Sequence, residues 1–272
     1  MRVALYGVGR MGAHHARHLG ALGAELRLVD PEKGHADRLD GIDAVVVAAP
    51  TRLHRALAEP WLVRGVPVLV EKPLAPTLAD AEALAAHAHC SVGHVERFNP
   101  AFAALAGVDA RFVQAERLAA WSDRGFDADV VLDLMIHDLD LFWALTRSPV
   151  REVRANGLSV RSGMVDIVHA RVETEGGHVG VFAASRISRK AVRSLRVFGP
   201  DGYWSADLRD RAVLRVSSGL EESVVPVAAY DALGAELQAF LGAVGGGPAF
   251  PVSAAEALPS LRAAEAIRCA CS

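Results

Sequence analysis

The feature that most constrains the fold is an alternation of short β-branched runs with helical patterns over the first third of the chain. Five such runs occur, separated by helical or turn segments, at residues 3–7, 25–30, 44–50, 67–73 and 91–95. Strands that are joined by helical crossovers lie parallel in one sheet. The sequence therefore predicts an α/β Rossmann domain, with a parallel doubly wound sheet, over residues 1–106.

The second half of the chain has a different pattern. Longer β-like segments begin after residue 107, and one helix containing residues 131–141 interrupts them. The stretches EGGH at 175–178 and GPDG at 199–202 have the composition of hairpin turns. Residues 107–272 are therefore predicted to form an α+β domain with a mostly antiparallel sheet and closing helices.

Composition argues against several classes of partner. The 272 residues are 51% apolar and 22% charged, which is typical of a globular chain with room for two domains. The net charge of −3 offers none of the clustered positive charge that binds nucleic acids or acidic membranes. Three cysteines cannot complete a disulfide framework, and no apolar run approaches the roughly 18 residues of a membrane span. We expect a cytoplasmic protein with no nucleic-acid or membrane partner.

The segment GVGRMG, residues 7–12, follows the first predicted strand and opens a helix. In that context the first glycine permits a tight turn, the second lets the backbone approach a pyrophosphate, and the third lets helix and strand pack closely. Asp30 ends the second strand, where an acid would bind the adenosine ribose hydroxyls, and this favours NAD over NADP. An accidental glycine turn is the alternative, and the strand, helix and acid in register argue against it.

Three histidines, His14, His15 and His18, lie on the helix after this loop. They could gather a metal ion, but no carboxylate or cysteine joins them at ligand spacing. We therefore interpret them as an exposed or helix-packing face.

Glu71 and Lys72 stand at the carboxyl end of the fourth run, followed by Pro73, which turns the chain. Ligands bind at this edge of a doubly wound sheet. A partly desolvated lysine there could transfer a proton or polarise a substrate hydroxyl. A solvated lysine at a strand end is the equally balanced alternative.

The segment VLDLMIHDLDL, residues 131–141, is apolar enough to be buried yet carries three aspartates and a histidine. In a helix of about 100° per residue, Asp133, His137 and Asp140 share one stripe, whereas Asp138 points away and is expected to matter least. The residues alone leave three interpretations open. Asp133 and His137 could be two metal ligands, a paired core histidine, or a proton-transfer pair in which Asp133 orients the imidazole.

Together, four motifs resemble the Gfo/Idh/MocA oxidoreductases, namely GVGRMG with His15, AAPTRLH, VEKPLA and DLMIHDLD. The resemblance covers nearly the whole chain. It implies a Rossmann domain followed by an open-faced sheet domain that binds substrate and joins copies into a homodimer or homotetramer. It also implies nicotinamide-dependent oxidation of a secondary hydroxyl, with Lys72, Asp133 and His137 as the catalytic group. A non-catalytic dinucleotide-sensing regulator is the alternative, and the presence of these three residues argues against it.

The resemblance also implies that Pro50, Thr51 and His54 lie near the cofactor. We predict no metal site. The predicted cofactor-binding residues are Gly7, Gly9, Arg10, Met11, Gly12, Asp30, Pro50, Thr51, His54, Glu71 and Lys72.

A narrower likeness lies in GHVERFNPAF, residues 93–102, which is similar to the branch containing UDP-N-acetylglucosamine 3-dehydrogenases. It implies a UDP-N-acetylhexosamine substrate, with a free sugar, a cyclitol or another carbonyl compound as the alternative. An arginine fork suits phosphate oxygens, and an acid or amide suits sugar hydroxyls. A structural ion pair of Glu96 and Arg97, with each other or with neighbours, is the competing interpretation. The implied substrate-binding residues are His94, Glu96, Arg97, Asn99 and His137.

A basic cluster lies at residues 186–196. It could attract a substrate diphosphate or form a solvated hairpin edge that resists sheet pairing, and we favour the edge. Its members are Arg186, Arg189, Lys190, Arg193 and Arg196.

Overall fold

A computed structural model describes residues 1–122 and 128–271, and the chain divides into two compact units. Each unit has its own sheet and its own core, and each is described separately below. The first unit comprises Met1–Val95 and Tyr230–Leu258, and the second comprises Glu96–Ala229 and Pro259–Ser272.

The return of residues 230–258 to the first unit differs from the single boundary, between residues 106 and 107, that the sequence suggested. Its cause is α6 (Ala232–Val244), whose side chains Leu237 and Phe240 belong to the core of the first unit. An apolar helix late in the chain carries no local signal of which sheet it will cover.

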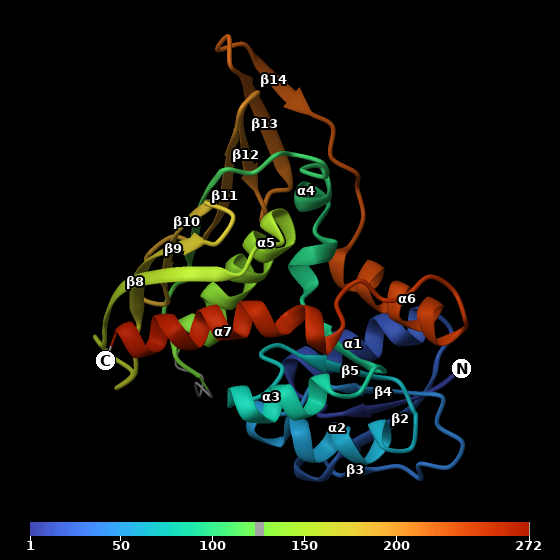
Figure 1. Ribbon diagram of the computed structural model, residues 1–272. Helices are drawn as coiled ribbons and strands as arrows, with labels where there is room; N and C mark the ends of the chain where they lie inside the picture. The colour runs from blue at the N-terminus through green and yellow to red at the C-terminus, as the bar shows by residue number, and fades with distance from the viewer. Residues whose placement is uncertain (123–127, 272) are drawn as a thin grey trace. The chain divides into compact units, whose positions relative to one another are not determined.

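Within the described residues, the first unit is built on a six-stranded sheet. Its strands are β1 (Arg2–Tyr6), β2 (Glu25–Asp30), β3 (His35–Ala36), β4 (Ala44–Val47), β5 (Val68–Glu71) and β6 (Cys90–Gly93). The order is β3-β2-β1-β4-β5-β6, parallel throughout except for the short edge strand β3 (Figure 1). The predicted Rossmann sheet is confirmed.

Helices pack on this sheet and bury its β-branched side chains. They are α1 (Arg10–Ala21), α2 (His54–Leu62), α3 (Leu78–Ala85) and α6, with 3-10 turns η1 (Pro31–Lys33) and η2 (Thr51–Leu53). α1 and α6 lie side by side (Figure 1). The core between them and the sheet contains Val3, Leu5, Leu19, Val46, Leu69, Leu237 and Phe240.

The described part of the second unit contains an eight-stranded sheet. Its strands are β7 (Phe112–Leu118), β8 (Val150–Leu158), β9 (Ile167–Thr174), β10 (Val179–Ser185), β11 (Val192–Gly199), β12 (Gly202–Asp207), β13 (Ala212–Ser217) and β14 (Glu222–Val225). The order is β14-β13-β12-β11-β7-β10-β9-β8, and only the β7–β10 pair in this described sheet is parallel. The mostly antiparallel sheet and both hairpin turns are confirmed.

One face of this sheet is covered by a helix (Figure 1). The π turn η4 (Val131–Met135) leads into α5 (Ile136–Thr146), and the rings of Phe142 and Phe182 meet edge to face at 5.6 Å. The sequence predicted a regular α-helix over residues 131–141, and the π turn corrects this. Other helical segments are η3 (Val95–Phe98), α4 (Pro100–Ala103) and α7 (Ala254–Ala270). The last boundary between the units falls within α7, between Leu258 and Pro259.

The close approach of α1 to β1 depends on Gly12. A Cβ added to Gly12 would lie 1.9 Å from the carbonyl oxygen of Gly7, a distance that no side chain tolerates. This is the close helix–strand packing predicted for the third glycine of the loop.

We expect Gly12→Ala to lower the free energy of unfolding by about 2–3 kcal/mol or more, because the strand and helix must separate. Gly20→Ala on the same helix is the matched control, since its Cβ would meet nothing within 4 Å in the described structure. A better helix former there should raise stability by up to about 1 kcal/mol. Denaturant unfolding measures both, and equal effects would contradict the tight packing at Gly12.

Candidate functional site

The glycine loop has the geometry that a dinucleotide phosphate needs. Gly7 has a φ of +85°, and a Cβ there would lie 2.6 Å from the carbonyl oxygen of Ala48, so only glycine fits. A Cβ on Gly9 would meet nothing within 4 Å among the described atoms, so the backbone is open on that side. No described side chain caps the first turn of α1. Its amide groups can therefore bind phosphate oxygens.

The two residues between Gly9 and Gly12 lie in different environments. Arg10 is exposed at the start of α1, whereas Met11 is half-buried and packs against the core. Their cofactor contacts stay predictions.

Asp30 lies at the end of β2, where the sequence predicted it. Its carboxylate accepts hydrogen bonds from the backbone N–H of Val8 at 2.6 Å and of Lys33 at 3.2 Å. Each carboxylate oxygen has a second lone pair, so the group can still accept ribose hydroxyls. Asp30 therefore fixes the glycine loop to the end of β2 and retains the capacity to bind a sugar.

Glu71 and His15 form a buried hydrogen-bonded pair at the end of β5. His15 Nε2 lies 2.7 Å from Glu71 Oε1, and Glu71 Oε2 accepts the backbone N–H of Lys72 at 3.1 Å. Burial alone would raise the pKa of Glu71, but His15 and the Lys72 charge hold it below its usual range. The carboxylate is thus ionised and binds the backbone of the predicted catalytic lysine. The sequence did not pair these residues because they are 56 positions apart.

Glu236, on α6, is a buried acid that the sequence analysis missed. Its side chain is inaccessible, and neither carboxylate oxygen has a hydrogen-bond partner among the described residues. Burial, and then the charge of Glu71, raise the pKa of Glu236 well above its usual value. The neutral form of Glu236 is therefore favoured beside the charge of Glu71.

The residues after β4 also lie at this edge of the sheet. Pro50 precedes η2, which begins at Thr51, and His54 begins α2. His54 is buried, and both of its ring nitrogens face backbone carbonyl oxygens. Cofactor contact by these three residues stays a prediction.

The catalytic pair predicted in the second unit spans two kinds of helix. Asp133 is half-buried in the π turn, and His137 is buried in the first turn of α5. Because a π turn closes i→i+5 hydrogen bonds, the 100° spacing used for the sequence does not apply over Val131–Met135. Single π turns inside helices occur frequently at functional sites.

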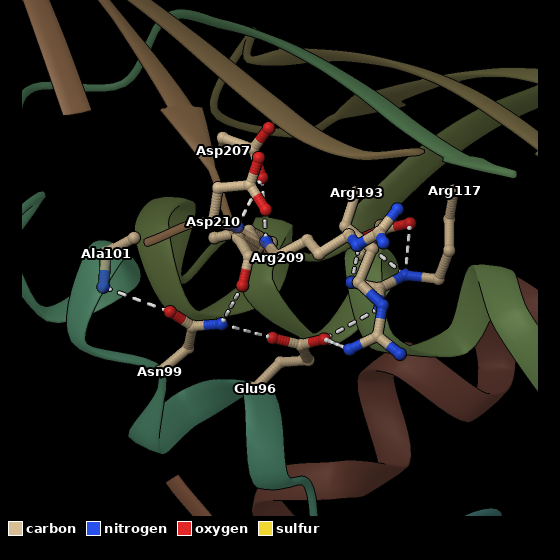
Figure 2. A network of polar contacts seen from close by, with 10 residues as sticks. Glu96, Asn99, Ala101, Arg117, Arg193, Asp207, Arg209 and Asp210 are labelled. Carbon is tan, nitrogen blue, oxygen red and sulfur yellow. Dashed lines mark hydrogen bonds and ion pairs between the residues drawn. The ribbon is translucent and has the colours of Figure 1, made fainter. Parts of the chain in front are cut away.

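Figure 2 shows a network of polar contacts that includes Arg117, a buried residue of β7. Arg117 donates to Glu96 and to Asp138, each at 2.7 Å, and its side chain is 4% exposed. Asn99 donates to Glu96 at 2.8 Å, and Arg193 from β11 donates to it at 3.3 Å. Burial would raise the pKa of Glu96, but the charges of Arg117 and Arg193 hold it below its usual range.

That Asp138 points away from Asp133 and His137 and matters least for the chemistry stays a prediction, but Asp138 is important for the packing of the second unit. Asp138 is buried and both of its oxygens accept from Arg117. Asp140 is buried as well and receives both arms of the Arg97 guanidinium, at 2.6 and 2.9 Å. Two of the polar groups in this apolar segment therefore neutralise buried arginines.

These contacts favour the interpretation that Glu96 and Arg97 form structural ion pairs. Glu96 pairs with Arg117 and Arg97 with Asp140, so the two do not pair with each other. His94 is buried after β6, and Asn99 is buried as the N-cap of α4. Substrate binding by His94, Glu96, Arg97 and Asn99 stays a prediction. The favoured interpretation of the basic cluster as a hairpin edge is wrong for Arg193 and Arg196, because β11 pairs with strands on both sides. Arg186 is buried, and the other four members are exposed.

Searches for metal and membrane features give two negative findings. No group of three His, Cys, Asp or Glu residues in the described segments could hold a metal ion. None of the helices formed by residues 1–122 and 128–271 is long and apolar enough to cross a membrane.

The parallel sheet, the open second glycine and the acid at the end of β2 together define a dinucleotide-binding protein. The chain matches the oxidoreductase family with an NAD-binding Rossmann fold over residues 30–92 and the GFO/IDH/MocA C-terminal domain over residues 101–205. It belongs to the Gfo/Idh/MocA family and is a nicotinamide-dinucleotide-dependent oxidoreductase.

Similar proteins cover most of the chain. The UDP-N-acetylglucosamine 3-dehydrogenase of Acidithiobacillus ferrooxidans is 34% identical over 277 residues, spanning 90% of this chain and 88% of its own. A structure of that enzyme, GnnA, has a TM-score of 0.93 at 32% identity and covers 100% of this chain and 97% of its own. The myo-inositol dehydrogenase Hyg17 of Streptomyces leeuwenhoekii is 35% identical over 228 residues, 68% of this chain and 70% of its own.

We expect Asp138→Asn to lower the free energy of unfolding by about 3 kcal/mol, because Arg117 loses a charged partner inside the protein. Asp109→Asn is the matched control, since it breaks a 2.9 Å pair with Arg111 at the surface and should change stability little. Chemical denaturation measures both variants. If Asp138→Asn lowered the free energy of unfolding only slightly, the network would not be important for the stability of the second unit.

Proposed function

We propose that this protein is an NAD-dependent dehydrogenase that transfers a hydride between a secondary hydroxyl of a UDP-N-acetylhexosamine and nicotinamide. The observation that carries the proposal is the extent of similarity to the UDP-N-acetylglucosamine 3-dehydrogenase, 90% of this chain at 34% identity. The inositol dehydrogenase match covers less, 68% of this chain.

Nicotinamide dinucleotide, when bound, supplies the acceptor or donor of the hydride. In the proposed mechanism His137 takes the hydroxyl proton while the hydride leaves the same carbon. Asp133 orients the imidazole and stabilises its charged form. Lys72, whose amide is held by Glu71, holds the reacting oxygen.

A cyclitol or free sugar is the second candidate substrate, and the 35% identity to an inositol dehydrogenase favours it. Initial rates with UDP-N-acetylglucosamine, UDP-glucose, N-acetylglucosamine and myo-inositol, followed by nicotinamide absorbance, separate the two. Turnover of the UDP-N-acetylhexosamine with a kcat/KM well above the others supports the proposal. Preference for inositol, or no turnover with any UDP-sugar, contradicts it.

We also propose that the face of the second sheet opposite α5 joins copies of this chain. The ring of Phe198 meets Phe112 edge to face at 5.9 Å and stacks on Tyr203 at 5.2 Å, and Phe112 is exposed. Exposed aromatic groups on a sheet face are typical of an interface.

His137→Ala and Lys72→Ala should each lower kcat about 10²–10⁴-fold, because proton transfer or its positioning is lost. NAD affinity, measured by fluorescence titration, should change little. The controls are His89→Ala and Lys190→Ala, which remove the same groups at exposed positions. Unchanged turnover in either active-site variant would remove that residue from the mechanism.

Asp30→Ala should raise the Kd for NAD about tenfold or more, since a charged acceptor for ribose hydroxyls is lost. The Kd for NADP should rise less, because Asp30 no longer repels the 2′-phosphate. Asp37→Asn is the control, because Asp37 also accepts a strand amide, that of Leu28 at 2.8 Å. Calorimetric titration with NAD and with NADP measures the ratio of their Kd values. An equal change in both Kd values would contradict a role of Asp30 in cofactor choice.

A further inference from the structure

His54 lies between the loops that follow two adjacent parallel strands. Its Nε2 is 2.9 Å from the carbonyl oxygen of Ala49, directly after β4. Its Nδ1 is 3.0 Å from the carbonyl oxygen of Pro73 and 3.3 Å from that of Leu74, after β5. The ring is 1% exposed, so these backbone groups are its polar surroundings in the described structure.

The protonation of this ring determines which loop it holds. Burial lowers the pKa of His54, although the three carbonyl oxygens and the charge of Glu71 oppose this. The ring is therefore neutral near pH 7 and carries one N–H. Because Nδ1 faces two acceptors and Nε2 faces one, we place the hydrogen on Nδ1, where it donates to the turn containing Pro73 and Leu74.

This places buried side chains on both sides of Lys72. Before it, the Glu71 carboxylate, fixed by His15, accepts the Lys72 amide. After it, His54 Nδ1, to which we assign the hydrogen, faces the carbonyl oxygens of the next two residues. The backbone that carries the lysine is thus held in both directions along the chain.

We propose that His54 is a positioning residue that fixes the Lys72–Leu74 turn and thereby the direction of the Lys72 side chain. It acts on Lys72 through the turn, and this role requires no contact of the ring with substrate or cofactor. The catalytic consequence rests on the proposed function of Lys72, whereas the ordering of the turn does not.

Three substitutions at this position separate the contacts. The amide of asparagine reaches the place of Nδ1, and the amide of glutamine reaches that of Nε2. His54→Asn therefore keeps a donor for the Lys72–Leu74 turn, and His54→Gln keeps only a donor for Ala49. His54→Leu fills similar volume and removes both.

Hydrogen exchange of the backbone around residues 70–78 is the direct readout and needs no turnover. We expect faster exchange there in His54→Leu and His54→Gln, and exchange close to the wild type in His54→Asn. We also expect kcat to fall about 10–100-fold in the first two, with substrate KM nearly constant, and to be largely retained in His54→Asn. Arg55→Gln is the matched control, because it removes the neighbouring pair of α2 with Asp80, 2.9 Å apart, without touching either loop.

The outcomes are distinct. If His54→Gln kept wild-type exchange and kcat while His54→Asn lost both, the hydrogen would lie on Nε2 and the proposal would be overturned. Equal exchange near residue 72 in all folded variants, with folding checked by thermal melting, would also overturn it. If the wild type oxidises none of the tested substrates, the proposed function fails, and the exchange pattern still decides whether His54 holds the turn.

Discussion

The ionised carboxylate of Glu71 is the group on which the polar edge of the first unit depends. It holds His15 of α1 and the backbone amide of Lys72, so one side chain joins a helix to a strand end. Its charge also disfavours ionisation of Glu236 on α6. Three segments distant in the sequence therefore depend on one buried negative charge.

In the second unit, the buried charges are paired around an arginine. Arg117 is placed under α5 by the alternation of β7, and it brings two carboxylates, Glu96 and Asp138, to one guanidinium. Because an unpaired buried charge is costly, all three elements that carry these residues must assemble together. Because its hydrogen bonds are directional, the network restricts the packing of η3, β7 and α5 more than apolar contacts alone would.

The sequence was sufficient for the features that depend on local periodicity. Strand runs, the glycine loop, the acid at Asp30 and the hairpin turns were all predicted at their observed positions. It failed where a partner comes from far along the chain, as with Glu71 for His15 and Arg117 for Asp138. Periodicity gives the direction of a side chain along its own element and says nothing of the charge that will face it.

The course of α6 was missed for the same reason, since its apolar face would suit either sheet. The buried acid on it, Glu236, could not be distinguished in the sequence from a solvated glutamate on a surface helix. Among the predicted site residues, His54 begins α2, and the carbonyl groups around its ring could be recognised only after the two loops had been placed.

The π turn at Val131–Met135 amounts to one residue more than a regular helix would hold. Each added residue rotates the remainder of a helix by about 100° relative to what precedes it. Asp133 lies before the end of that turn, whereas the two aspartates paired with arginines lie after it. The extra residue thus rotates the side chains after the π turn relative to those before it. It sets the direction of Asp133 relative to Asp138 and Asp140, which pair with the arginines, to a value that a regular helix would not give.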